Sequence, residues 1–410
     1  MKKKALILLL LFFSVKAFSQ NFSSKQYKED FDFFWNTVND NYCYFNKKPI
    51  DWKKLRSIYQ PQIDTVSSRN AFVGVMEKAL YELYDHHCSL NTNTPYSRRL
   101  VPTGADIWVE FANGHAVVKE VRRGFGADKV GIRAGMEIIA INGQPVDEAI
   151  KPFLAHTPDI EARNFALRLA LAGDHITKRK ITVKSNAKVT DVFPDKDGMM
   201  LENVQYPAEV GSGKIGSIGY IRINNFLFDD GIIAKFDSVL NGMLQQRALI
   251  IDLRETPSGG NTTVARAILS RFITKEHFYQ KHELYAEEKQ TGIKRSWEEI
   301  VSPRGKAYTK PVVVLADHWT GSIAEGITIA FDGMKRATVI GTELARLNGS
   351  IESVEMPNTH IRFNLPTERL YHINGQPREL YKPTIEVDVT RPYQGDLILD
   401  TALKVLQKTK

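Results

Sequence analysis

Cysteine is scarce in this sequence: only Cys43 and Cys88 occur in 410 residues. Two cysteines are too few for a disulfide framework, and whether they pair with each other stays open. Cys88 follows His86 and His87, but consecutive residues cannot readily converge on one tetrahedral ion, and no second Cys/His pair with zinc spacing occurs. We therefore expect neither a metal nor another cofactor.

A strong excess of one charge is also missing. The formal net charge is +8, and four of the lysines behind it stand at positions 2, 3, 4 and 16. Without these four the net charge would be +4 (8 − 4). Such a balance is too weak to indicate a nucleic-acid partner.

Long hydrophobic runs are confined to the N-terminus. Three lysines precede the apolar stretch 5–15, and Ala17-Phe18-Ser19 follows with small residues at its first and third positions. This pattern is typical of a secretory signal peptide, and the apolar stretch is too short to span a bilayer as a stable anchor. We expect residues 1–19 to be removed and the mature protein to be exported, either periplasmic or secreted, without a stable membrane anchor.

The rest of the chain, about 390 residues, is longer than one hydrophobic core usually serves, so several domains are expected. Residues 20–98 are expected to form a helical subdomain, because apolar residues recur there at helical spacing. They are Phe31, Phe34, Trp35 and Val38, then Phe72, Val75, Met76, Ala79, Leu80 and Leu83. This subdomain ends in the run Asp-His-His-Cys-Ser-Leu at 85–90.

Residues 99–190 show a β-rich pattern. Alternating strands at 107–111 and 116–121 lead to a short helix, a glycine turn, an apolar strand and the hairpin turn Asn142-Gly143. The run from Gly131-Ile132-Arg133-Ala134-Gly135 to Asn142-Gly143 resembles the PDZ signature, with Met136 where aspartate is usual. A PDZ groove binds an extended peptide along a sheet edge, so the resemblance implies a peptide or unfolded protein as partner.

Residues 191–410 alternate between strands and helices, which predicts a largely parallel α/β core. The polar stretch 274–306 is expected to leave that core. The expected strands cover 216–223, 248–254, 311–316 and 338–341, and the expected helices cover 230–244, 263–272 and 324–334.

Turns follow two of these buried strands. One contains Gly259-Gly260, and the other places Ser322 where a strand gives way to a helix. A serine at such a turn can present its hydroxyl beside the first free amides of the helix, as a nucleophile requires. The alternatives are a tight glycine turn and an ordinary helix N-cap.

The order of these features resembles the serine peptidases that include the C-terminal processing (tail-specific) proteases and the tricorn core proteases. The resemblance implies a crotonase-like ββα core in which Ser322 is the nucleophile. It also implies an oxyanion hole from the amide of Ile323 with that of Gly259 or Gly260; which glycine donates stays open.

The family activates its serine in two ways. C-terminal processing enzymes use a lysine about 25 residues later, but Leu347 stands at the matching place in the turn 341–349. Tricorn-type members use a histidine and a glutamate, and by resemblance these are His87 as general base and Glu379 as the residue that orients it. His86 stands where tricorn enzymes have a serine that relays this contact.

The sequence thus predicts a signal peptide (1–19), a helical subdomain (20–98), a PDZ-like domain (99–190) and a serine peptidase core (191–410). The expected function is that of an exported serine endopeptidase with a Ser/His/Glu acyl-enzyme mechanism. The alternative is a non-catalytic family member that binds peptides.

Overall fold

The computed structural model describes residues 22–196, 206, 208–391 and 393–408. The predicted signal peptide lies outside these residues. Within them, no helix combines the length and the apolar character needed to cross a membrane.

Three helices build the N-terminal region: α1 (Ser24–Asn41), α2 (Trp52–Asp64) and α3 (Arg69–Tyr81). Ser23, Asp51 and Ser68 cap them, because each side-chain oxygen accepts a hydrogen bond from a backbone N–H of the first turn. Their apolar faces meet in one core, where the rings of Trp35 and Trp52 stack with centroids 4.0 Å apart.

A segment distant in sequence completes that helical core. Strands β15 (Ser350–Glu355) and β16 (Arg362–Tyr371) lie beside α1, and β16 also pairs with the short strand β1 (Ser89–Leu90). Phe363 and Leu365 are buried among the helices. Part of the C-terminal region expected in the peptidase core therefore packs with the N-terminal helices.

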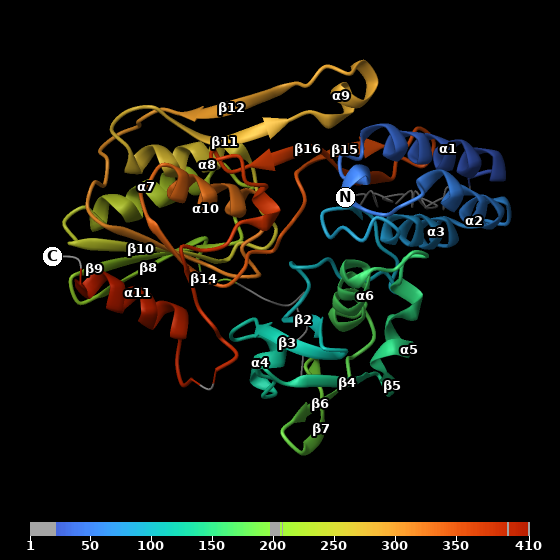
Figure 1. The fold of residues 1–410 in the computed structure, drawn as a ribbon, viewed down its shortest axis with the longest axis horizontal. Coiled ribbons are helices and arrows are strands. Elements are labelled where there is room, and N and C mark those ends of the chain that lie inside the picture. Colours follow the sequence, from blue (N-terminus) through green and yellow to red (C-terminus); the bar gives the residue numbers. More distant parts are fainter. Residues whose placement is uncertain (1–21, 197–205, 207, 392, 409–410) are drawn as a thin grey trace, which may run out of the picture.

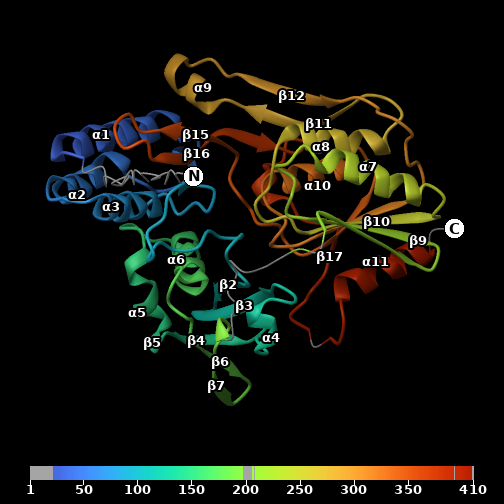
Figure 2. The ribbon, with the colours of Figure 1, turned by 180° about the vertical axis from the view of Figure 1, so that it is seen from behind.

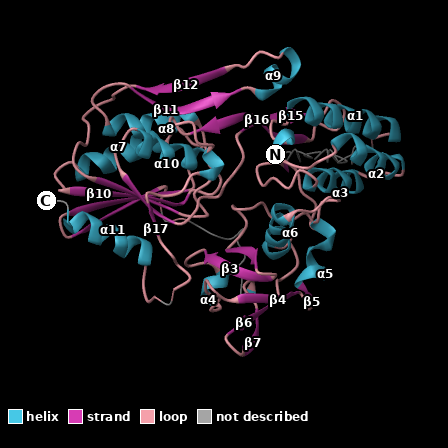
Figure 3. Ribbon diagram, in the orientation of Figure 1, coloured by secondary structure: helices cyan, strands magenta, loops and turns pink. Residues whose placement is uncertain are grey.

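The PDZ-like region has its own sheet and its own core. Its strands are antiparallel in the order β2-β3-β4-β6-β7, with β5 on β4, and Figure 3 shows it set apart from the large sheet. The elements are β2 (Ile107–Ala112), β3 (His115–Val121), α4 (Gly126–Lys129), β4 (Glu137–Ile141), β5 (Gln144–Pro145), α5 (Val146–Ile150), α6 (Ile160–Ala172), β6 (Ile181–Ser185) and β7 (Lys188–Val192).

A six-stranded sheet forms the centre of the large domain, in the order β17-β14-β13-β10-β9-β8. All neighbouring pairs are parallel except β8 with β9. The strands are β8 (Val210–Ile215), β9 (Ile218–Asn224), β10 (Ala248–Glu255), β13 (Val312–Ala316), β14 (Thr338–Gly341) and β17 (Ile385–Glu386).

Helices cover both faces of this sheet, as its buried central strands β10 and β13 require. One face packs against α7 (Ile232–Met243), α8 (Thr262–Leu269) and α10 (Ile323–Gly333), and the other against α11 (Leu397–Lys408). Figures 1 and 2 show these layers from opposite sides. The layers confirm the predicted α/β class.

The polar stretch after α8 leaves the core as expected and forms an arm. It consists of β11 (His277–Glu283), α9 (Tyr285–Thr291) and β12 (Ser296–Val301). Strand β11 pairs with β16, so the arm continues the sheet that carries β15 and β1. In Figure 1 this arm runs above α8 toward α1.

Candidate active site

Ser322 stands immediately before α10, at the carboxyl end of the parallel strand β13. Its backbone has φ 53° and ψ −114°, a strained conformation for a residue with a Cβ. The carboxylate of Glu325 accepts a hydrogen bond from the Ser322 N–H at 2.8 Å. Thr256, which follows β10, accepts from the Gly321 N–H at 3.3 Å and donates to the Trp319 carbonyl at 3.2 Å. These contacts hold the strained turn at Ser322 against the turn that follows β10.

His87 lies beside this serine, although 235 positions separate them in sequence. Its Nε2 is 3.1 Å from Ser322 Oγ, and its Nδ1 is 2.7 Å from the main-chain oxygen of Asn348. A carbonyl only accepts, so Nδ1 carries the proton and Nε2 presents a lone pair to the hydroxyl. Burial and the Arg378 charge lower the pKa of His87 to about 4, against the contributions of Asn348 and Asp85. The imidazole is therefore neutral at pH 7, as a general base must be.

The expected contact from Glu379 to His87 is not made in this structure, because the Asn348 carbonyl occupies Nδ1. His86 does not bridge the gap: its ring stacks on Phe165, with centroids 4.5 Å apart. Among the described residues, His86 Nε2 and Glu379 Oε2 have no hydrogen-bond partner. Burial raises the pKa of Glu379 and lowers the pKa of His86 well below its usual value.

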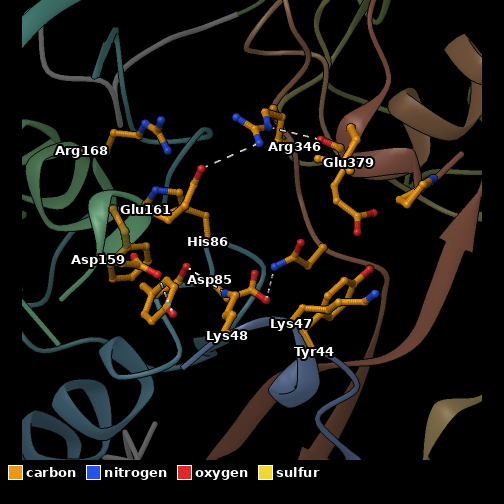
Figure 4. A pocket seen from close by; sticks show the side chains of 16 residues that line it. Tyr44, Lys47, Lys48, Asp85, His86, Asp159, Glu161, Arg168, Arg346 and Glu379 are labelled. Atoms are coloured by element: carbon orange, nitrogen blue, oxygen red, sulfur yellow. Dashed lines mark hydrogen bonds and ion pairs between the residues drawn. The ribbon is translucent and has the colours of Figure 1, made fainter. Parts of the chain in front are cut away.

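Both side chains line a cavity of about 290 Å³ that also borders Asp85 and Asn348. Figure 4 shows Glu379 and Arg168 on opposite sides of this cavity. An imidazole is bulkier than the serine of tricorn enzymes, and here it turns toward α6 instead of toward the glutamate. The relay implied by the resemblance therefore has no continuous path in this arrangement.

The glycine pair follows β10 and faces the serine turn. Gly259 has φ 67°, and a Cβ on it would lie 2.4 Å from Ser322 Cβ. A Cβ on Gly260 would instead meet the Leu227 carbonyl oxygen at 2.1 Å. Both positions require glycine, but only at Gly259 would a side chain collide with Ser322.

The backbone amides distinguish the two glycines further. The Gly259 N–H donates to the Thr256 carbonyl at 3.2 Å, within the turn. Among the described residues, the N–H groups of Gly260 and Ile323 have no acceptor. The Ile323 amide is one of the free donors that every helix N-terminus leaves. These two amides are the ones available to an oxyanion.

Leu347 stands where a lysine base would stand, and it is buried next to the serine turn. Its Cδ1 lies 3.4 Å from the place that a Cβ on Gly321 would take. Lys382, further along the chain, pairs instead with Glu343 and Glu386 near the surface. The described residues also contain no group of three or more His, Cys, Asp or Glu that could hold a metal ion.

The sequence did not identify Arg378, which links the two halves of the site. Its buried guanidinium donates to the carbonyls of Leu347 and Gly349 at 2.9 and 2.8 Å and lies 3.7 Å from Glu325. Burial raises the pKa of Glu325 to about 7. The sequence does mark Glu325, because Ser322 and Glu325 form the Ser-x-x-Glu pattern that is typical of a helix capping box. Nothing comparable marks Arg378.

The PDZ-like sheet contacts both turns of the site. Glu120 on β3 lies 2.5 Å from Nδ1 of His318, four positions before Ser322. Arg122, the residue after this strand, donates two hydrogen bonds of 3.0 and 2.9 Å to Glu255, just before the glycine turn. The Nδ1 atom of His318 is thus paired with Glu120.

Comparison with known proteins identifies the parts of the chain. Residues 217–390 match peptidase family S41, residues 23–80 match the tricorn protease C1 domain, and residues 101–152 match the PDZ domain. The carboxyl-terminal-processing peptidase 3, chloroplastic, of Arabidopsis thaliana is 24% identical over 345 residues, covering 78% of this chain. The aligned part spans 60% of that relative's length.

Solved structures share the fold across nearly the whole chain. Mature CPAF complexed with lactacystin has a TM-score of 0.60 at 16% identity, covering 94% of this chain and 97% of its own. The photosystem II D1 C-terminal processing protease has a TM-score of 0.58 at 16% identity, with 93% and 97% covered. A putative peptidase from Parabacteroides merdae has a TM-score of 0.56 at 16% identity, with 95% and 98% covered.

The fold is therefore that of the C-terminal processing proteases, and the predicted class is confirmed. Residues 217–390 are similar to peptidase family S41, and they follow regions that are similar to the tricorn protease C1 domain and the PDZ domain. Peptidase family S41 and the Arabidopsis relative, to which this chain is similar, are both peptidases.

Proposed function

We propose that the protein is a serine endopeptidase in which Ser322 is the nucleophile and His87 the general base. The observation that carries the proposal is the 3.1 Å contact between His87 Nε2 and Ser322 Oγ, with Nδ1 committed to a carbonyl. Hydrogen-bond reach and a fixed tautomer are what a serine–histidine pair needs. The proposal gives the orienting role to the Asn348 carbonyl and not to Glu379.

The reaction is acyl transfer. Ser322 Oγ attacks the peptide carbonyl carbon while its proton passes to His87 Nε2, and the new oxyanion faces the amides of Gly260 and Ile323. The C–N bond then breaks, and the leaving amine takes the proton from Nε2. Water repeats both steps on the acyl-enzyme, releases the acid and restores the serine.

The PDZ domain supports peptides or unfolded proteins as substrates, since such domains bind extended chains by strand addition. Its contacts to both active-site turns would allow a bound chain to be presented to Ser322. The signal-like N-terminus supports an exported, periplasmic or secreted, enzyme. No cofactor enters this mechanism.

A fluorophosphonate probe tests the proposal on the mature protein. We expect it to form one covalent adduct, which mass spectrometry of the digested protein locates on Ser322. Labelling that disappears after heat denaturation would show that it depends on the folded site. A protein that binds peptides but takes up no probe would instead be the non-catalytic family member.

Gly259 offers a second measurement. We expect Gly259→Ala to lower kcat/KM by roughly a hundredfold, because an added Cβ would lie 2.4 Å from that of Ser322 and must displace the nucleophile. Peptide hydrolysis and a thermal melt measure the effect.

Gly216→Ala is the matched control. Gly216 lies between β8 and β9 with a similar φ of 60°, but a Cβ there would meet no atom within 4 Å. It shares the backbone strain, which costs about 1 kcal/mol of stability, and should keep full activity. Equal activity in the two variants would show that Gly259 does not shape the site.

A further inference from the structure

The loop that supplies the carbonyl for His87 is held by a buried carboxylate. We propose that Asp85 is a positioning residue, which sets the orientation of the His87 ring by fixing both the backbone of His87 and the side chain of Asn348. This inference rests on the proposed function of His87 as the base.

Asp85 contacts both partners of the Nδ1–carbonyl bond. Its Oδ1 accepts from the His87 backbone N–H at 2.9 Å, and its Oδ2 accepts from Asn348 Nδ2 at 2.8 Å. The carboxylate is only 3% exposed, and hydrogen bonds to a buried charge are among the stronger ones in proteins. In Figure 4 Asp85 lies at the cavity that borders this contact.

The flanks of the loop are fixed separately. Arg378 binds the carbonyls of Leu347 and Gly349, on either side of Asn348. The Asn348 carbonyl between them can still tilt when its peptide plane rotates. Unlike a carboxylate, it carries no full charge that would attract an imidazolium. The bond from the Asn348 side chain to Asp85 restricts that tilt, and so maintains the geometry that a triad carboxylate would otherwise provide.

Tyr42 allows this role to be separated from a merely structural one. Its hydroxyl donates to the same Asp85 Oδ2 at 2.8 Å, but it does not contact the Asn348 loop through that bond. If Asp85 only stabilised the fold, loss of either donor would have the same effect. If it positions His87, loss of the Asn348 donor should slow the reaction of Ser322 much more than loss of the Tyr42 donor does.

The test measures the rate at which a fluorophosphonate phosphonylates Ser322, with a thermal melt for each variant. In this reaction Ser322 Oγ attacks phosphorus, its proton passes to His87 and fluoride leaves, so the rate depends on the same base as acylation does. Asp85→Asn places an amide donor opposite the amide donor of Asn348, and Asn348→Asp places a carboxylate opposite the carboxylate of Asp85. We expect each variant to slow phosphonylation about ten- to a hundredfold. The double variant Asp85→Asn/Asn348→Asp exchanges donor and acceptor. Because the new amide can donate to both the new carboxylate and the Tyr42 oxygen, phosphonylation should return to within about fivefold of the wild-type rate.

Tyr42→Phe should lower the melting temperature but keep the rate of phosphonylation within about threefold of wild type. The inference is overturned if Asp85→Asn reacts at the wild-type rate, if Tyr42→Phe is as slow as Asn348→Asp, or if the folded double variant stays slow. Because the double variant preserves the number of hydrogen bonds, it tests whether Asp85 positions His87 even where a single variant fails to fold. A wild-type protein unlabelled at Ser322 overturns the proposed function itself, which distinguishes the two failures.

Discussion

Replacement of Ser322 by alanine should abolish hydrolysis of an unfolded protein substrate, with a loss of at least about 10⁴-fold, as for other serine nucleophiles. The melting temperature should change little, because the side chain is half-buried and alanine adopts the same strained backbone at the same cost. Product release over time and a thermal melt of the same preparation measure the two quantities.

Ser68→Ala is the control that separates a nucleophile from an ordinary helix cap. Ser68 caps α3 through a 3.2 Å bond from the Ala71 N–H and lies in the helical region. Its loss should cost about 1 kcal/mol of stability with activity unchanged. If Ser322→Ala behaves in the same way, with a lower melting temperature and retained hydrolysis, Ser322 is a helix cap and the proposed peptidase mechanism is wrong.

The sheet and its turns could be predicted because the chemistry that defines them is local. The strand predicted at 311–316 is β13, and the helix predicted at 324–334 is α10, each shifted by one residue at most. Ser322 stands between them, so its place in the turn from strand to helix follows from the same pattern. Gly259 and Gly260 follow β10 in the same way.

The partner of His87 could not be predicted, because a main-chain oxygen is common to every residue and leaves no mark in the sequence. Asn348 reaches the histidine through tertiary folding across 261 positions. The packing of β15 and β16 against the N-terminal helices is equally non-local. The resemblance suggested Glu379 instead, and the visible warning was His86 at the place of a relay serine.

Replacement of His87 by alanine should slow turnover by about a thousandfold or more, as loss of a triad base does. His86→Ala is the matched truncation one position away. Its ring stacks on Phe165 and does not contact the Ser322–His87 pair through any hydrogen bond, so it should lower stability but keep turnover within about tenfold of wild type. Comparable losses in both variants would mean that His86 takes part in a relay after all.

The pH profile of acylation identifies the base independently. A proton on Nε2 blocks base catalysis, so the wild-type rate should rise with pH through the His87 pKa of about 4 and be level near neutrality. An unperturbed imidazole would place this rise at about pH 6.5, and a lysine would extend it above about pH 9. Lys382→Ala should leave the profile unchanged, because its ammonium pairs with surface carboxylates. A rate still climbing above about pH 9, with His87→Ala active and Lys382→Ala inactive, would assign the base to the lysine.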